Sequence, residues 1–155
     1  METGVAQPYY DAIHLIERLH RHFLDVLKIE LDRLSIQDIN NVQSLILYNI
    51  GEDELTVGEL TMRGYYLGSN VSYNLKKLVE AGFLHHQRSR MDRRSVRISL
   101  TEKGREIHDI VDQLYAKHVK SIEQVGGINA SDFLTINKAL VRLERFWTDQ
   151  IRYRL

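Results

Sequence analysis

The fold is decided by one stretch of sequence, Leu78-Val-Glu-Ala-Gly-Phe-Leu-His-His-Gln-Arg-Ser-Arg-Met-Asp-Arg-Arg-Ser-Val-Arg-Ile-Ser-Leu-Thr-Glu-Lys-Gly104. It predicts the end of a helix, a stop at the first glycine, a short strand, a basic turn and a second strand with alternating apolar residues. A helix followed by a hairpin with a basic tip suits duplex DNA. The helix fits the major groove, and long cations at the tip reach phosphates or the minor groove.

The sequence before this stretch predicts further helices. Apolar residues recur every three or four positions over residues 8–34, which predicts a long amphipathic helix. Asn40 with Gln43 forms a capping-box pattern at the start of a short helix. Thr56 with Glu59 forms a second capping-box pattern, and it opens another short helix.

Two short helices, a turn, a third helix over residues 69–81 and a hairpin together describe a winged helix-turn-helix unit. We assign it to residues 38–101, within a single domain over residues 1–155 that is mainly α with a small β-hairpin wing. Long amphipathic helices over residues 8–37 and 102–155 flank it. A unit of this size cannot cover the apolar stripes of these long helices. We therefore expect the helices to join two chains in a homodimer. The alternative is a monomer in which these helices pack entirely on their own winged unit.

Composition excludes several classes of protein. The chain has 155 residues, of which 43% are apolar, enough for one core. It has no cysteine, which excludes disulfides and cysteine-ligated zinc. No apolar run approaches the roughly 20 residues that span a bilayer, and residues 1–8 do not resemble a signal peptide. We therefore expect a cytoplasmic protein with no membrane partner. No nucleophile–base constellation, phosphate loop or dinucleotide fingerprint appears, so we expect neither an enzyme nor a cofactor.

Charge is distributed unevenly along the chain, although the formal net charge is zero. Between Arg63 and Arg105, ten Lys and Arg residues face three acids, a local charge of +7. The remainder holds eleven basic and eighteen acidic residues, a charge of −7. This split predicts a basic surface on an acidic body, and a phosphate backbone responds to the local field.

The hairpin and the segments around it resemble the MarR family of bacterial transcription regulators. Asp92-Arg93-Arg94 matches the family's Asp-x-Arg, and Leu100-Thr-Glu-Lys-Gly104 matches its Leu-Thr-x-x-Gly junction. Glu59-Leu60 and the run from Asn70 to Phe83 fit its third and fourth helices. The resemblance implies a homodimer that binds pseudo-palindromic double-stranded operator DNA. It also implies a repressor, often released by a small anionic or phenolic ligand.

The helix over residues 69–81 would be the recognition helix. If Val71, Leu75 and Leu78 face the core, its polar residues fall on the opposite side. Early residues of a recognition helix reach base edges and later cations hold phosphates. We therefore predict DNA contacts for Ser69, Asn70, Ser72, Tyr73, Lys76 and Lys77, the two lysines on phosphates. The alternative is an ordinary solvated helix face. Ser72-Tyr73 stands where many family members have Thr-Arg, so the operator sequence does not carry over.

The tip of the hairpin supplies the second set of predicted DNA contacts. Arg94 is placed to enter a narrow minor groove, where the negative potential is enhanced. Asp92 would hold this guanidinium in a bidentate pair. Arg90 and Arg93 are predicted either to contact phosphates or to be disordered without DNA. The alternative for Asp92 and Arg94 is a solvated ion pair within the turn, which contributes little.

Several tyrosines suggest an aromatic-lined pocket for a small aromatic or phenolic effector, and the candidates are Tyr10, Tyr48, Tyr65, Tyr66 and Tyr115. Core or interface positions are the alternative reading of these tyrosines.

Two other functions compete with ligand-controlled operator binding. His14, Glu17 and His20 have helical spacing that would suit a metal-sensing regulator, but no second cluster completes a tetrahedral site, and surface histidines are the simpler reading. The other rival is a winged-helix protein-interaction module whose basic hairpin docks an acidic partner.

Overall fold

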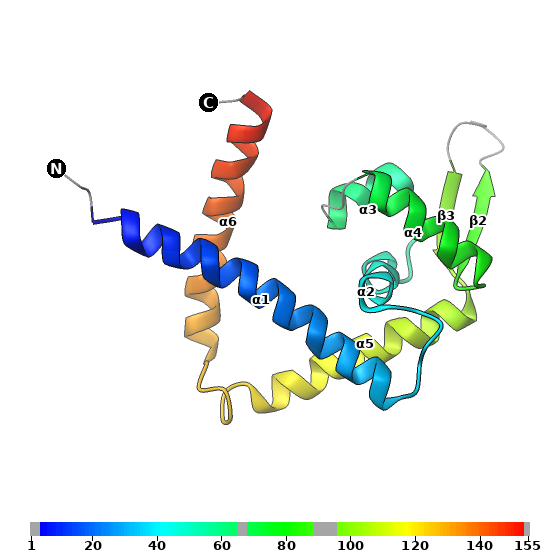
Figure 1. Cartoon of the computed structure of the whole chain (residues 1–155), viewed down its shortest axis with the longest axis horizontal. Coiled ribbons are helices and arrows are strands. Elements are labelled where there is room, and N and C mark those ends of the chain that lie inside the picture. The colour runs from blue at the N-terminus through cyan, green and yellow to red at the C-terminus, as the bar shows by residue number, and fades with distance from the viewer. Residues whose placement is uncertain (1–3, 65–67, 89–95, 154–155) are drawn as a thin grey trace. The chain divides into compact units, whose positions relative to one another are not determined.

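The computed structural model describes residues 4–64, 68–88 and 96–153 (Figure 1). The chain forms two compact units, residues 1–114 and 115–155, with one helix crossing from the first to the second. The elements are α1 (Ala6–Arg33), α2 (Asn41–Ile50), β1 (Leu55–Thr56), α3 (Val57–Gly64), α4 (Gly68–Glu80), β2 (Leu84–Arg88), β3 (Val96–Leu100), α5 (Glu102–Ser121) and α6 (Ala130–Tyr153). The mainly helical fold with a hairpin is confirmed. Within the described part of the chain, no helix combines the length and apolar composition needed to cross a membrane.

The two predicted helix starts have side-chain caps. At α2, the Asn40 side chain accepts a hydrogen bond from the Gln43 backbone at 2.7 Å, and the Gln43 side chain accepts one from the Asn40 backbone at 3.1 Å. At α3, Thr56 Oγ1 accepts a hydrogen bond from the Glu59 backbone N–H at 3.2 Å. Both caps satisfy backbone donors that a helix start leaves without a partner.

The hairpin belongs to an antiparallel sheet with three strands in the order β1-β3-β2. The pairing of β2 with β3 puts Leu84 opposite Leu100 and His86 opposite Ile98. The sequence predicted these two strands and missed β1, in which Leu55 pairs with Ile98. A strand of two residues is too short to show alternation, and its pairing partner lies 43 positions away.

The core of the first unit lies between the three short helices and the inner face of the sheet. The predicted buried face of α4 is confirmed, since Val71, Leu75 and Leu78 are each 5% exposed or less. Other elements add further buried side chains, among them Leu31, Ile46, Leu47, Ile50, Leu60, Phe83, Ile98 and Ile107. This core fixes which side of α4 remains on the surface.

A dense set of contacts joins the end of α4 to the start of α5. Thr101 Oγ1 donates a hydrogen bond to the Gly82 carbonyl at 2.7 Å and accepts one from the Gly104 N–H at 3.1 Å. The Thr101 N–H also reaches the Phe83 carbonyl at 3.1 Å. A Cβ on Gly104 would lie 2.2 Å from that carbonyl oxygen, so only glycine fits here. The Leu-Thr-x-x-Gly pattern therefore marks a packed junction.

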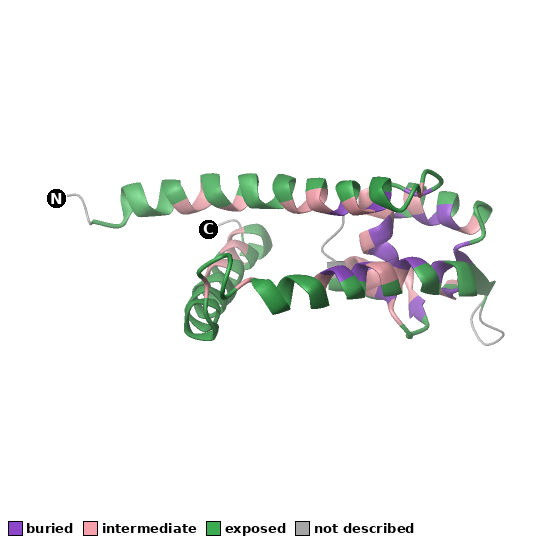
Figure 2. Cartoon of the chain, turned by 90° about the horizontal axis from the view of Figure 1, so that it is seen from below, coloured by how far each residue is buried: buried purple, intermediate pink, exposed green. Residues whose placement is uncertain are grey.

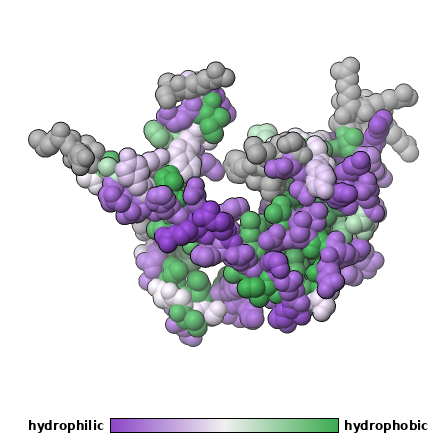
Figure 3. All heavy atoms as spheres, in the orientation of Figure 1, coloured by the Kyte–Doolittle hydropathy of each residue, from purple (hydrophilic) through white to green (hydrophobic). Residues whose placement is uncertain are grey.

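The long helices are covered unevenly. Leu27 and Leu31 of α1 are buried, whereas Leu15 and Leu19 nearer its start are 47% and 61% exposed. Among the described residues of α6, none is buried, and its ribbon in Figure 2 is green and pink throughout. Its exposed apolar side chains include Phe133, Leu134, Ile136, Leu140, Val141, Phe146 and Ile151. Figure 3 shows hydrophobic residues at the surface, interspersed among hydrophilic ones.

Candidate nucleic-acid interface

The outer face of α4 carries the predicted recognition residues. Because the other side of the helix is buried, Asn70, Ser72, Tyr73, Lys76 and Lys77 are all exposed. Ser69 lies in the first turn of α4, and its side chain is outside the described part of the structure. The helix sequence contains a single acid, at its last position, so this face is polar with a cationic second half.

Tyr73 is the large aromatic side chain of this face, and it is 62% exposed. The Lys77 ammonium lies 5.7 Å from the centroid of the Tyr73 ring, within the range of a cation–π contact. Spacing of four residues along a helix brings these two side chains together. The contact favours a ring that lies along the helix surface.

Asn74 anchors the first half of α4 and does not belong to the exposed set. Its amide donates a hydrogen bond to the Asn70 carbonyl at 2.9 Å, and its Oδ1 accepts one from Gln43 Nε2 at 3.3 Å. The same Gln43 caps α2, so α2 and α4 share one polar connection. This connection helps to fix the direction in which the recognition face points.

The predicted wing residues Arg90, Asp92, Arg93 and Arg94 all lie outside the described residues. The strands that lead to them are described up to the pair of Arg88 with Val96.

Two cations of the basic segment are paired within the chain. Arg63 Nη1 lies 2.7 Å from Asp53 Oδ2. Lys103 Nζ lies 3.0 Å from Asp38 Oδ2, donates a hydrogen bond to the Ala81 carbonyl at 3.0 Å and sits 4.3 Å from the centroid of the Phe83 ring. The sequence counted both as part of one basic surface and missed that Lys103 ties the end of α4 to the segment before α2. The match to Leu-Thr-x-x-Gly located this junction without indicating a role for the lysine.

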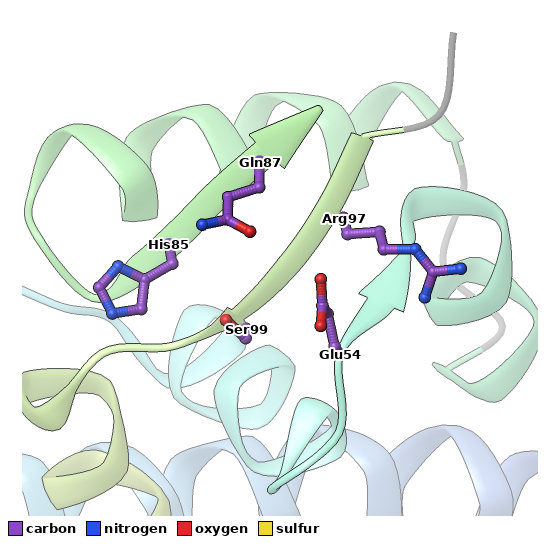
Figure 4. A pocket seen from close by; sticks show the side chains of 5 residues that line it. All are labelled: Glu54, His85, Gln87, Arg97 and Ser99. Carbon is purple, nitrogen blue, oxygen red and sulfur yellow. The ribbon is translucent and has the colours of Figure 1, made fainter. Parts of the chain in front are cut away.

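The outward face of the sheet differs in charge from the face of α4. His85, Gln87, Arg97 and Ser99, together with Glu54 before β1, line a pocket of about 160 Å³ (Figure 4). The register places Gln87 opposite Arg97 and His85 opposite Ser99. Glu54 and Arg97 lie on the same side of the sheet, so the electrostatic fields of these opposite charges partly cancel.

A second, more apolar cavity of about 460 Å³ lies between α4 and the inner side of the sheet near the hairpin. Its volume is in the range of small-molecule sites. Ser72 and Lys76, which belong to the outer face of α4, also reach this cavity. The other residues that line it are Val57, Leu75, Val79, Glu80, His86, Val96 and Ile98.

The structure does not gather the predicted effector tyrosines in a described cavity. Tyr10 is 57% exposed on α1, and Tyr48 of α2 stacks on His108 of α5 with 5.2 Å between ring centroids. Tyr115 is the first residue of the second unit and half-buried. Tyr65 and Tyr66 are outside the described residues. The two cavities above are lined by other side chains.

The metal hypothesis rested on His14, Glu17 and His20, which are all exposed on α1. Within the described ranges of this chain, no group of three or more His, Cys, Asp or Glu side chains is arranged to hold a metal ion.

Comparisons with known proteins agree with this geometry. Residues 39–104 match a family model described as a winged helix DNA-binding domain. The structure of Streptococcus pneumoniae FabT in complex with DNA is similar, with a TM-score of 0.72, 23% identity and coverage of 91% of this chain and 98% of that one. A mutant MarR from E. coli complexed with operator DNA gives a TM-score of 0.71, 20% identity and coverage of 91% and 99%. These likenesses show the fold.

Sequence identity to a curated transcription regulator is higher than to either of these structures. The chain is 37% identical over 145 residues to the exopolysaccharide II synthesis transcriptional activator ExpG of Rhizobium meliloti, covering 94% of this chain and 74% of that protein. The chain belongs to the MarR family. As a MarR-family protein it is a transcription regulator with a winged-helix DNA-binding fold, and not an enzyme.

Proposed function

We propose that the protein binds double-stranded operator DNA as a homodimer, with α4 of each chain in a major groove. One observation carries this proposal. The buried apolar side of α4 leaves Asn70, Ser72, Tyr73, Lys76 and Lys77 together on the surface, with hydrogen-bonding groups early in the helix and cations later. A face of this kind matches base edges flanked by phosphates. We also assign Ser69 to it, from its place in the first turn.

The wing completes the proposed interface. We assign Arg94 to the minor groove, Asp92 to the orientation of its guanidinium, and Arg90 and Arg93 to phosphates, on the basis of the sequence. Arg88 at the end of β2 is exposed and adds to the basic charge that leads toward the tip. Arg63 and Lys103 are left out of this set because both are paired with acids of their own chain.

Salt dependence tests the electrostatic part of the proposal. Each neutralised phosphate releases counterions, so the logarithm of the association constant should fall by about 0.9 per contact for each unit of log salt. Titration of labelled duplex DNA at several salt concentrations should give a steep line, and Lys76→Gln should reduce its slope by about one contact. Lys103→Gln is the matched control and should leave the slope unchanged. A flat line for the unaltered protein would exclude DNA as the partner.

The proposed homodimer is supported by α6. Its exposed apolar residues Phe133, Ile136 and Leu140 recur at helical spacing, and all three are more than a third exposed in the single chain. A second copy would cover them and supply the second recognition helix that a pseudo-palindromic site requires. Leu114, another apolar residue of the flanking helices, is only 6% exposed and is already covered within its own chain. Sedimentation at micromolar concentration tests the dimer, and a lone 18.2 kDa species would contradict it.

The direction of control has two candidates. Repression is what the family resemblance implies. Activation is favoured by the relative from Rhizobium meliloti, which is named a transcriptional activator. A reporter driven by an operator-bearing promoter separates them, because removing the protein raises expression under repression and lowers it under activation.

A small aromatic or phenolic effector is part of the proposal. The cavity beside α4 supports it, because Ser72 and Lys76 belong both to that cavity and to the proposed DNA face. An occupant there would compete with DNA. The alternative effector-binding site is the one predicted from the tyrosines Tyr10, Tyr48, Tyr65, Tyr66 and Tyr115. Release of labelled DNA by simple phenols, compared between Leu75→Phe and Tyr48→Ala, distinguishes the two binding sites. If no phenol releases the DNA, an effector of this class is contradicted.

An acidic protein partner is the remaining rival. A docking face for protein would be expected to expose apolar residues in its centre, whereas α4 exposes mainly polar and cationic ones. Competition between duplex DNA and an acidic polypeptide for the protein decides this point.

A further inference from the structure

Tyr73 stands apart from the other residues of the α4 face. Its neighbours Ser72, Lys76 and Lys77 present hydrogen-bonding groups or charge, whereas Tyr73 presents a six-membered aromatic ring that is 62% exposed. It lies on the side of the helix opposite the buried Val71 and Leu78. Burial in the core of its own chain therefore does not account for this ring.

The major groove offers few partners for an apolar ring. Base edges present acceptors, amino donors and one apolar group, the C5 methyl group of thymine. Contact of an aromatic side chain with that methyl group buries apolar surface on both partners without leaving a polar group unpaired. The ring edge of a tyrosine suits this contact, and the hydroxyl remains free to point past the methyl group.

One contact involves the ring itself, and two hydrogen bonds anchor the helix turn that carries it. Lys77 lies over it at 5.7 Å from the centroid, which favours a ring close to the helix surface. Asn74, one position along the helix, is bonded both to the Asn70 carbonyl and to Gln43 of α2, which anchors this turn of α4. A ring with restricted freedom loses less conformational entropy when it binds.

We propose that Tyr73 is a specificity-determining residue that recognises the C5 methyl group of a pyrimidine in the operator half-site, thymine in unmodified DNA. The inference rests on the proposed operator binding and names the atom that one side chain of that interface reads. The same methyl group is present on 5-methylcytosine, so the chemistry recognised is the methyl group and not the hydrogen-bonding edge of thymine.

The test starts from an operator selected by the full-length protein from random duplex DNA. Each thymine of this operator is then replaced singly by deoxyuridine, which removes only the methyl group. For the unaltered protein, replacement at one thymine in each half-site should lower affinity about fourfold, the effect of one buried methyl group. A cytosine in place of this thymine should bind better when methylated at C5 than when unmethylated.

Matched variants assign the effect to the ring. Tyr73→Phe keeps the ring and should keep the fourfold difference between thymine and deoxyuridine, whereas Tyr73→Ala should bind both equally. Lys76→Gln is the control, and it should weaken binding to both duplexes by the same factor. Because Tyr73 is exposed, thermal unfolding should be the same for all variants.

Three results would overturn the inference. If removing the methyl group costs the Tyr73→Ala variant as much as the unaltered protein, another residue reads it. If Tyr73→Phe loses the discrimination, the hydroxyl group and not the ring is responsible. In both cases the proposed operator binding stands. If no duplex sequence is enriched at all, the proposed function fails and the inference fails with it.

Discussion

The winged unit, residues 38–101, and helix α6 differ in how far they bury their apolar residues. In the winged unit, Ile46, Leu47 and Ile50 are fully buried and close a core around which the sheet and helices pack. In the second unit, none of the described residues of α6 is buried, although its apolar residues recur at the same helical spacing. The core of the winged unit is thus covered within a single chain, and we infer that the apolar stripe of α6 is covered by a second copy.

The largest expected effect separates these two kinds of apolar residue. Ile46→Ala removes methyl groups from a closed core and leaves a cavity, so it should lower the free energy of unfolding by about 2–5 kcal/mol. The loss should be the same at every protein concentration, because the core lies within one chain. Denaturant unfolding at two concentrations measures it. A loss below about 1 kcal/mol would mean that the core is not closed as described.

The junction at Gly104 should give the next largest effect. Gly104→Ala places a Cβ 2.2 Å from the Phe83 carbonyl oxygen. Because that oxygen belongs to the backbone, either the segment at Phe83 or α5 must shift. We expect a destabilisation of about 2–3 kcal/mol. Gly58→Ala in α3 is the control, because its Cβ meets only Thr56 Oγ1 at 3.9 Å. The control should be neutral or slightly stabilising. Equal effects of the two substitutions on the unfolding midpoint would refute the packed junction.

Substitution on α6 should act through assembly instead of through the core. Leu140→Lys places a charge in the apolar stripe of this helix, where Leu140 is 43% exposed in the single chain. We expect the dimer to dissociate and operator affinity to fall by tenfold or more, about 1.4 kcal/mol. The winged unit should unfold as before. Sedimentation and DNA titration measure both quantities, and Lys138→Glu, a change of surface charge on the same helix, is the control. An unchanged dimer would remove α6 from the interface.

Helix caps provide the smallest and most evenly matched comparison. Asn40 caps α2 and Asn129 accepts a hydrogen bond from the Asp132 N–H at 2.9 Å at the start of α6. Each substitution by alanine should cost about 1 kcal/mol. Asn40→Ala should show this loss at all protein concentrations. Asn129→Ala should instead appear as a weaker dimer, because in the proposed dimer α6 is packed by the partner. Thermal unfolding across a range of concentrations tells the two patterns apart.

The sequence was most informative where neighbouring residues decide the structure. The apolar spacing of Val71, Leu75 and Leu78 located the buried side of α4, and Asn40 with Gln43 located a helix start, since both signals act over one or two turns. These local signals also fixed the exposed set that forms the candidate interface. The Leu-Thr-x-x-Gly pattern correctly marked the junction at Gly104.

What the sequence did not reveal depends on contacts between distant residues. The pairing of Leu55 with Ile98 and the contact of Lys103 with Asp38 join segments that no local pattern connects. For the same reason, the total of cations overstated the charge available to DNA, because Arg63 is paired with Asp53. The effector tyrosines were grouped by residue type, and their assignment to one pocket stays a prediction.

The central claim is that the winged unit reads DNA and that α6 pairs two chains. The symmetry of the DNA that the protein selects tests this claim most directly. The protein is mixed with random duplexes, bound sequences are recovered and enriched, and the sequences are aligned. We predict an inverted repeat whose half-sites lie about 10 base pairs apart, because a two-fold dimer sets its recognition helices one helical turn apart. Enrichment of a single, unrepeated half-site would contradict the pairing of two chains through α6. Absence of any enriched sequence would contradict reading of DNA by the winged unit.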